Sequence, residues 1–388
     1  MISFTRYRTL LAQRELRVTF AASVLGRLPI GITGLAILLL VQSSSDSFAR
    51  GGAAAAFYVT GVAAMAPAIG RLIDRYGPRT LLLACGLAFP AALLALVGAV
   101  AHGAPWLAFA FAAAAGASFP PISVCVRTYF RRRLGDDLLA AAYSMESVLI
   151  EIIFIVGPML VALFVATASA AAAVWFAAAC GFAGTLVFLR SPGLRDWRIE
   201  ARTSASLLGP LGERGFPSLI AVVLCFAAAF GFMEVGIAAY AVETADPALA
   251  GVLLAVMSIG SALGGLVYGS RGWHFPLARQ FAAALALMGA GLGVLALRWD
   301  PWPFAAWCAL AGVTMAPGLI IQSMLAAKIA RPEHSTEAFT WATSALLAGV
   351  GIGLAVGGAL LEVFPSSVAL AAGAGSALLA AIAARLAL

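Results

Sequence analysis

The sequence predicts an all-α membrane protein with 12 transmembrane helices. The chain is 63% hydrophobic and 11% charged, with a mean hydropathy of +1.00, which leaves too little polar surface for a protein of 388 residues in water. Apolar runs long enough to cross a hydrocarbon core of about 30 Å as helices recur along the whole chain. The runs are continuous rather than alternating, which excludes a transmembrane β-barrel.

Each expected span follows one apolar run, and short segments with charged or turn-forming residues separate neighbouring runs. No small-residue cleavage site follows the first run, so we expect it to remain as an anchor. The expected spans cover residues 18–41, 50–72, 80–101, 104–130, 138–166, 168–189, 216–242, 248–269, 276–298, 302–327, 336–363 and 366–387.

The basic residues predict the orientation. With 12 spans, both termini lie on one side, and all 24 basic residues except Arg27, Arg50 and Arg298 fall on that side. The positive-inside rule then places both termini in the cytoplasm. The same bias accounts for the net charge of +7, so we expect no nucleic-acid partner. The composition is typical of a bacterial protein, and we expect the bacterial inner membrane as its location.

The longest polar stretch, residues 191–215, predicts two halves. We expect an N-terminal six-helix bundle over 1–190, a cytoplasmic linker over 191–215, and a C-terminal six-helix bundle over 216–388. Short matches between the halves support a repeat. They align Gly26 with Gly231 at an offset of 205, and Gly116 with Gly312 at an offset of 196.

The segment 70–81, Gly-Arg-Leu-Ile-Asp-Arg-Tyr-Gly-Pro-Arg-Thr-Leu, places four charges between the second and third spans. Its pattern Gly-x-x-x-Asp-Arg-x-Gly-x-Arg resembles motif A of the major facilitator superfamily. The resemblance implies two pseudo-symmetric six-helix bundles that alternate access to a site between them near the membrane midplane. It also implies a cytoplasmic gate in this loop, formed by Gly70, Asp74, Arg75, Gly77 and Arg79.

In the family, the motif's aspartate lies near the N-terminus of span 11, where the helix dipole favours a negative charge. Here that helix is expected to begin near Ser335. Pro78 departs from the family pattern, and the matching segment of the second half, 265–272, lacks both the aspartate and the following arginine. The expected gate is therefore one-sided.

Charged residues within the expected spans need a role, because a charge at the bilayer centre costs about 2.5 kcal/mol or more. Arg27, Glu151 and Glu234 lie near the middle of spans 1, 5 and 7. We expect Glu151 or Glu234 to bind and release a proton during transport, and Arg27 to modulate this or to hold an anionic substrate group. The alternative is a permanent buried pair, with Glu151 as the partner of Arg27.

Glu146 lies nearer the cytoplasmic end of span 5 and is expected to be a gate or surface residue. It projects about 140° away from Glu151 on a helix of 3.6 residues per turn. Four large side chains could line an apolar cavity, although simple packing is the more common role for such residues. They are Tyr143, Phe232, Met233 and Trp341.

The direction and the substrate are less constrained. Gly157-Pro158 in span 5 resembles the core of motif C of drug–proton antiporters, without its further glycines, and favours proton-coupled efflux of a small organic molecule. The alternative is proton-coupled or facilitative uptake of a nutrient such as an organic acid or sugar. The chain has no Asn, and Gln322 is its only Gln within a span, which argues against a sugar.

Other classes fit poorly. The charged groups within spans are isolated, whereas a channel needs a continuous polar stripe. No histidine lies well inside a span, and no nucleophile–base spacing is present, so we expect no enzyme activity. The five cysteines lie within spans without metal-ligand spacing. We therefore expect no cofactor and no metal, and a monomer whose partners are a small-molecule substrate, protons and the lipid bilayer.

Overall fold

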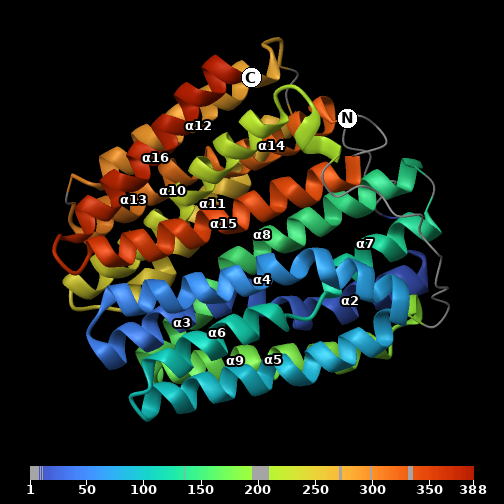
Figure 1. Cartoon of the computed structure of the whole chain (residues 1–388), viewed down its shortest axis with the longest axis horizontal. Helices are drawn as coiled ribbons and strands as arrows, with labels where there is room; N and C mark the ends of the chain where they lie inside the picture. The colour runs from blue at the N-terminus through green and yellow to red at the C-terminus, as the bar shows by residue number, and fades with distance from the viewer. Residues whose placement is uncertain are drawn as a thin grey trace.

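A computed structural model describes residues 8, 10, 12–134, 136–194, 209–270, 273–297, 299–330 and 335–388. Every regular element in these residues is an α-helix or a short 3₁₀ turn, and no strand occurs among them. The helices run roughly side by side (Figure 1). The prediction of an all-α membrane fold is confirmed.

The first half of the chain contains eight helices between Arg14 and Leu189, followed by a 3₁₀ turn. They are α2 (Arg14–Arg27), α3 (Pro29–Ser45), α4 (Phe48–Tyr76), α5 (Pro78–Ala101), α6 (Pro105–Ala117), α7 (Ile122–Arg133), α8 (Asp136–Thr167), α9 (Ala170–Leu189) and the turn η1 (Pro192–Leu194).

The second half begins with a 3₁₀ turn and continues with seven helices. They are η2 (Gly209–Gly212), α10 (Phe216–Glu243), α11 (Leu249–Ser270), α12 (Leu277–Leu295), α13 (Pro301–Gly312), α14 (Met315–Ile329), α15 (Ser335–Leu360) and α16 (Ser366–Ala387). The expected linker falls largely on residues 195–208, which lie outside the described residues.

Three expected spans are interrupted helices. The first span divides into α2 and α3 at Leu28, because Pro29 has no N–H to continue the helical hydrogen bonds. The fourth divides into α6 and α7 at the Pro120-Pro121 pair, and the tenth into α13 and α14 at Val313–Thr314. From the sequence, all three are expected to be continuous helices, and the structure corrects this.

Eleven segments of the described chain are long and apolar enough to cross a membrane. They correspond one by one to expected spans, and the 29-residue helix α4 occupies the position of the remaining span. The start of α2 and the end of α16 lie at one end of the bundle, called here the terminal end (Figure 1). The opposite end, called the far end, contains the connections at residues 46–47, 244–248 and 361–365.

Close glycine contacts repeat in the two halves. Each contact brings a glycine of one helix onto a backbone oxygen of another, where a Cβ would not fit. The matching pairs are Gly61 on Ala113 with Gly260 on Ala309, and Gly116 on Tyr58 with Gly312 on Met257. These pairs keep an offset of 199 in spans 2 and 8 and 196 in spans 4 and 10.

The same contacts correct the alignment of spans 1 and 7. Gly31 packs against Ile153 and Gly157 of α8, and Gly231 packs against Val350 and Gly353 of α15. Gly31 is therefore the structural counterpart of Gly231, at an offset of 200. The predicted match of Gly26 with Gly231 is wrong by five residues. Glycine recurs along both segments, so the sequence alone does not distinguish the two registers.

Candidate functional site

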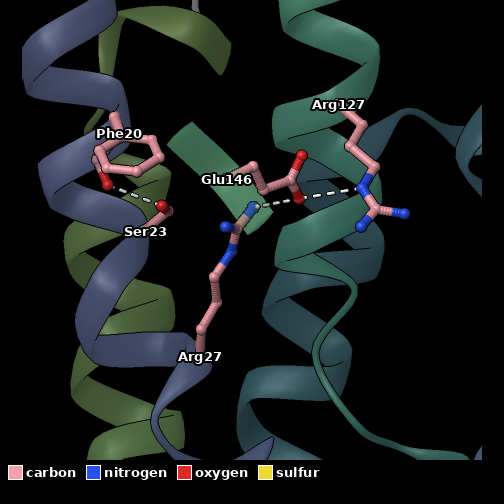
Figure 2. Close-up of polar contacts among 5 residues, drawn as sticks. All are labelled: Phe20, Ser23, Arg27, Arg127 and Glu146. Carbon is pink, nitrogen blue, oxygen red and sulfur yellow. Dashed lines mark hydrogen bonds and ion pairs between the residues drawn. The ribbon is translucent and has the colours of Figure 1, made fainter. Parts of the chain in front are cut away.

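A buried ion pair joins the first and fifth spans. The Nη2 atom of Arg27 lies 3.2 Å from Oε1 of Glu146, and the Nε atom of Arg127 donates to the same oxygen at 2.9 Å. Figure 2 shows the Glu146 carboxylate between the two guanidinium groups, which come from α2 and α7. The cluster has two cations and one anion, so it carries a formal charge of +1.

The environments of the two arginines differ. The Arg27 side chain is 1% exposed and that of Arg127 is 61% exposed, so the cluster runs from the interior to the surface. Arg27 is the last residue of α2, where the helix dipole favours a cation. Its Nε and Nη1 atoms are buried and have no hydrogen-bond acceptor among the described residues.

This arrangement corrects two predictions. The buried partner of Arg27 is Glu146, whereas the sequence analysis named Glu151. Glu146 is 1% exposed, which contradicts the expectation of a surface residue, whereas its expected place at a gate stays a prediction. Arg27 is the last residue of α2, and its guanidinium lies level with Glu146, five residues before Glu151 on α8.

Glu234 lies where the two halves meet. It projects from α10 toward α3, and a Cβ built on Gly34 would lie 3.5 Å from the Oε1 atom of Glu234. Its carboxyl forms no ion pair or hydrogen bond with any described residue. The structural register places Gly34 and Glu234 at equivalent positions of the repeat, 200 residues apart. The absent side chain on one helix thus makes room for the carboxyl on the other.

Glu151 is also partly buried on α8 and forms no ion pair with a described residue. It lies on the stretch of α8 between Glu146, which binds Arg27, and Ile153, which packs on Gly31. Arg27, Glu146, Glu151 and Glu234 therefore follow one another along the axis of the first span, from the terminal end toward the middle. The three predicted intramembrane groups lie at successive levels of the bundle, and of these Arg27 alone is paired among the described residues.

The predicted cavity-lining residues have different surroundings. Phe232 packs against Gly357 of α15 and Gly373 of α16, and Met233 belongs to the buried core. Both contacts are of the packing kind given as the alternative, and the cavity-lining role stays a prediction. Trp341 is partly buried at the edge of the core. The Tyr143 side chain lies outside the described part of the chain.

The predicted cytoplasmic gate can be followed only in part. Gly77 connects α4 and α5 with φ of 79°, a conformation that favours glycine, and Arg79 is exposed in the first turn of α5. The side chains of Arg71, Asp74 and Arg75, and of the expected partners near Ser335, lie outside the described set. The predicted latch therefore stays a prediction.

At the far end, helices of the two halves are in direct contact. α4 lies along α15 (Figure 1). There Gly52 packs on Leu354, and Gly358 packs on Phe48, with no space for a Cβ at either glycine. On the other side of the bundle, Gly251 of α11 packs in the same way on the Pro158 oxygen of α8. We call these three contacts the far-end seal.

A hydrogen-bonded carboxylate adds a fourth contact to the far-end seal. Glu362, just after α15, accepts from the Ala49 amide at 2.9 Å and from the Ser47 hydroxyl at 2.7 Å. These bonds, with the nearby Arg50, hold the pKa of Glu362 below its usual value. Glu362 thereby caps the N-terminus of α4 from the other half of the chain. This contact is not among the expectations from the sequence, in which its one signal is Ser47, a helix-capping residue type.

The geometry thus defines a class: a multi-pass helical membrane protein with two repeated halves that contact at one end. Between the halves lies one carboxyl, that of Glu234, without a partner among the described residues. Residues 19–269, more than half of the chain, match the family model described as Major Facilitator Superfamily. The chain belongs to this family of membrane transporters. No curated protein sequence matches it.

Solved structures of transporters share the fold at low sequence identity. A single-site mutant of the nucleoside transporter NupG has a TM-score of 0.78 at 14% identity, covering 95% of this chain and 99% of its own. The POT family transporter PepTSo has a TM-score of 0.75 at 13% identity, covering 96% of this chain and 97% of its own. A bacterial homologue of the iron transporter ferroportin in an inward-facing state has a TM-score of 0.72 at 13% identity, covering 96% and 99%.

Proposed function

We propose that this protein is a proton-coupled secondary transporter that exports a small organic molecule by alternating access between its two halves. The observation that carries the proposal is the position of Glu234. Its carboxyl faces Gly34 across the boundary between the halves and has no partner among the described residues. A membrane transporter of this family supplies the setting in which such a carboxyl can couple proton binding to conformation.

The coupling follows from the cost of charge in a membrane. A carboxylate between two apolar helices is expensive to bury without a cation, whereas the protonated group is not. Proton binding at Glu234 therefore favours a state in which α3 and α10 stay together. Loss of the proton favours a state in which the carboxylate reaches water. Glu151 on α8 is the second proposed proton site, because it too is partly buried without an ionic partner among the described residues.

Alternating access requires one end of the molecule to be closed at a time. The far-end seal holds α4 on α15 and α8 on α11 through glycine contacts. We take this arrangement as the state that receives substrate at the terminal end. With both termini in the cytoplasm, as the arginine distribution predicts, that is the cytoplasmic side. The two bundles, over 1–190 and 216–388, are the bodies that rock against each other.

We assign the Arg27–Glu146 pair to packing within the first half rather than to substrate binding. Both residues, and Arg127, come from helices of the same half, so rocking of the halves need not break the pair. Export is favoured over uptake by the Gly157-Pro158 pair. Gly157 packs closely on Gly31, because a Cβ built on Gly157 would lie only 2.6 Å from the Gly31 backbone. The backbone oxygen of Pro158 packs on Gly251 in the far-end seal.

The experiment has two stages. Purified protein is screened by thermal unfolding against metabolites and antibiotics, because a ligand bound only by the folded state raises the melting temperature. Transport of the best ligand is then measured in proteoliposomes under an imposed pH gradient of either sign. Export by proton exchange predicts that the ligand crosses the membrane in the direction opposite to the flow of protons. Movement of ligand with protons would instead support the uptake alternative.

The variants Glu234→Gln and Glu151→Gln identify the proton site. We expect at least one to lose gradient-driven accumulation while it still exchanges ligand across the membrane. Glu15→Gln is the matched control, because Glu15 is an exposed carboxylate paired with Arg133 at 2.8 Å. If both test variants remain fully coupled to protons, the proposal is wrong.

A further inference from the structure

An apolar groove lies in the second half of the chain, separate from the charged cluster and from the far-end seal. It is formed by α11, α12 and α14 and has a volume of about 650 Å³. Leu263 and Val267 of α11 and Leu287 of α12 line its sides, and the buried Ile321 of α14 lines it as well. Thr314 contributes no free polar group to this lining, because its hydroxyl donates to the Ala311 oxygen. The groove is therefore a trough for hydrocarbon.

A polar collar bounds the groove at the terminal end. The rings of Tyr268 and Trp273 stack with centroids 5.3 Å apart. The Nε1 atom of Trp273 donates to the backbone carbonyl oxygen of Tyr268 at 3.0 Å. The Tyr268 hydroxyl donates to Gln280 Oε1 at 2.6 Å, and Gln280 Nε2 donates to the backbone carbonyl oxygen of Phe275 at 2.6 Å. This chain of bonds joins α11 to α12 and fixes the mouth of the trough. Aromatic rings of this kind favour the level of lipid headgroups.

A cation lies at the same collar. Arg279, on the first turn of α12, is exposed and lines the groove. It forms no ion pair with any described residue. A guanidinium group binds phosphate oxygens through paired hydrogen bonds. The site therefore combines an apolar trough with a phosphate-binding group at its mouth.

We propose that this groove binds one anionic phospholipid, with an acyl chain along α11 and α12 and its phosphate on Arg279. A water-soluble anion would gain nothing from the apolar walls. An uncharged lipid would leave Arg279 without its counterion. The level of the collar, at the end of α11 and the start of α12, matches the headgroup region of the leaflet at the terminal end. This site does not depend on what the protein transports.

Trp273 offers a local reporter. Purified full-length protein in detergent is titrated with phosphatidylglycerol or phosphatidylcholine that carries bromine on the acyl chains, which quenches nearby tryptophan. The Trp273 contribution is the difference between the unmodified protein and Trp273→Phe. We expect saturable quenching, with phosphatidylglycerol preferred about fivefold, since one arginine near an anionic headgroup contributes about 1 kcal/mol.

Two variants test the two parts of the site. Arg279→Gln is expected to bring the ratio of affinities for phosphatidylglycerol and phosphatidylcholine close to one. Ala283→Phe, which fills the trough, is expected to abolish the saturable phase of quenching for both lipids. Ala283→Leu is a smaller filling change that should weaken it. Arg190→Gln and Ala371→Phe are the controls, because both residues are exposed on other helices. Quenching that never saturates, or that Arg279→Gln and both Ala283 variants leave unchanged, overturns the proposal.

Discussion

The guanidinium of Arg27 and the carboxylate of Glu146 form an ion pair of 3.2 Å, with both side chains no more than 2% exposed. The pair connects α2 to α8 across more than 100 residues of sequence, within one half of the transporter. Since a buried charge is tolerated only with its partner, the two residues depend on each other. That dependence can be measured.

Glu146→Gln should strongly destabilise the protein. The change leaves the buried Arg27 cation without its anion, and loss of one partner of a buried pair costs about 3–5 kcal/mol. We expect a markedly lower melting temperature in detergent, and partial recovery in the double variant Arg27→Met with Glu146→Leu. Arg127→Gln is the control, because the Arg127 side chain is 61% exposed and its loss leaves Glu146 paired with Arg27. Equal melting temperatures for all four proteins would show that the pair does not stabilise the fold.

The sequence predicts the fold, but it does not predict which side chains contact each other within the fold. Hydrophobic runs and arginine positions indicate the number and order of spans, because the bilayer imposes length and charge rules on each segment separately. The partner of Arg27 depends instead on how α2 and α8 are aligned along the bundle. Pro29 marks the interruption of span 1, but it does not reveal that the guanidinium reaches Glu146 rather than Glu151.

Contacts between the halves are harder still to predict. Gly34 and Glu234 face each other only in the register fixed by Gly31 and Gly231, and the sequence repeat suggested a different one. Glu362 lies in an exposed connection, where a carboxylate normally needs no partner. Its role depends on the seating of α4 against α15, which no local pattern specifies.

Gly52→Val and Gly251→Val should open the far-end seal. Their side chains would overlap the backbone oxygens of Leu354 and Pro158 in the other half, which must then move away. Gly61→Val is the matched control: its side chain would overlap the Ala113 oxygen within one half, so it should lower stability without separating the halves.

The separation can be measured as a distance between two spin labels, one at Phe57 on α4 and one at Val356 on α15. Both side chains are more than 40% exposed, and the native cysteines are first replaced by alanine. A longer distance population in both seal variants, absent in Gly61→Val, is the expected result. If the seal variants keep the original distance, the glycine contacts do not hold the far end closed.

Substitution at Gly34 should affect transport in proportion to side-chain size. A Cβ at this position lies at ordinary contact distance, 3.5 Å, from Glu234 Oε1, so Gly34→Ala should be tolerated. Gly34→Leu should press on the carboxyl and reduce proton-driven transport at least tenfold, about 1.4 kcal/mol of barrier. Ligand flux in proteoliposomes checks this, with thermal unfolding to confirm the fold. Equal flux in both variants would argue against a carboxyl that works at this boundary.

Acid should weaken the far-end seal through Glu362. The Ala49 amide, then the Ser47 hydroxyl, lower the pKa of Glu362 while the seal is closed, and opening returns it to the usual value of about 4.3. The carboxylate therefore stabilises the closed end above that value, and the contribution is lost as the pH falls through the lowered pKa.

We expect the distance between labels at Phe57 and Val356 to lengthen on acidification. In Glu362→Gln the longer population should be present at neutral pH and should not change with pH. Glu243→Gln is the control, because Glu243 caps α16 through Ser366 within its own half and should leave the distance unchanged. A distance that responds to acid equally in the unmodified protein and in Glu362→Gln would assign the effect to another group.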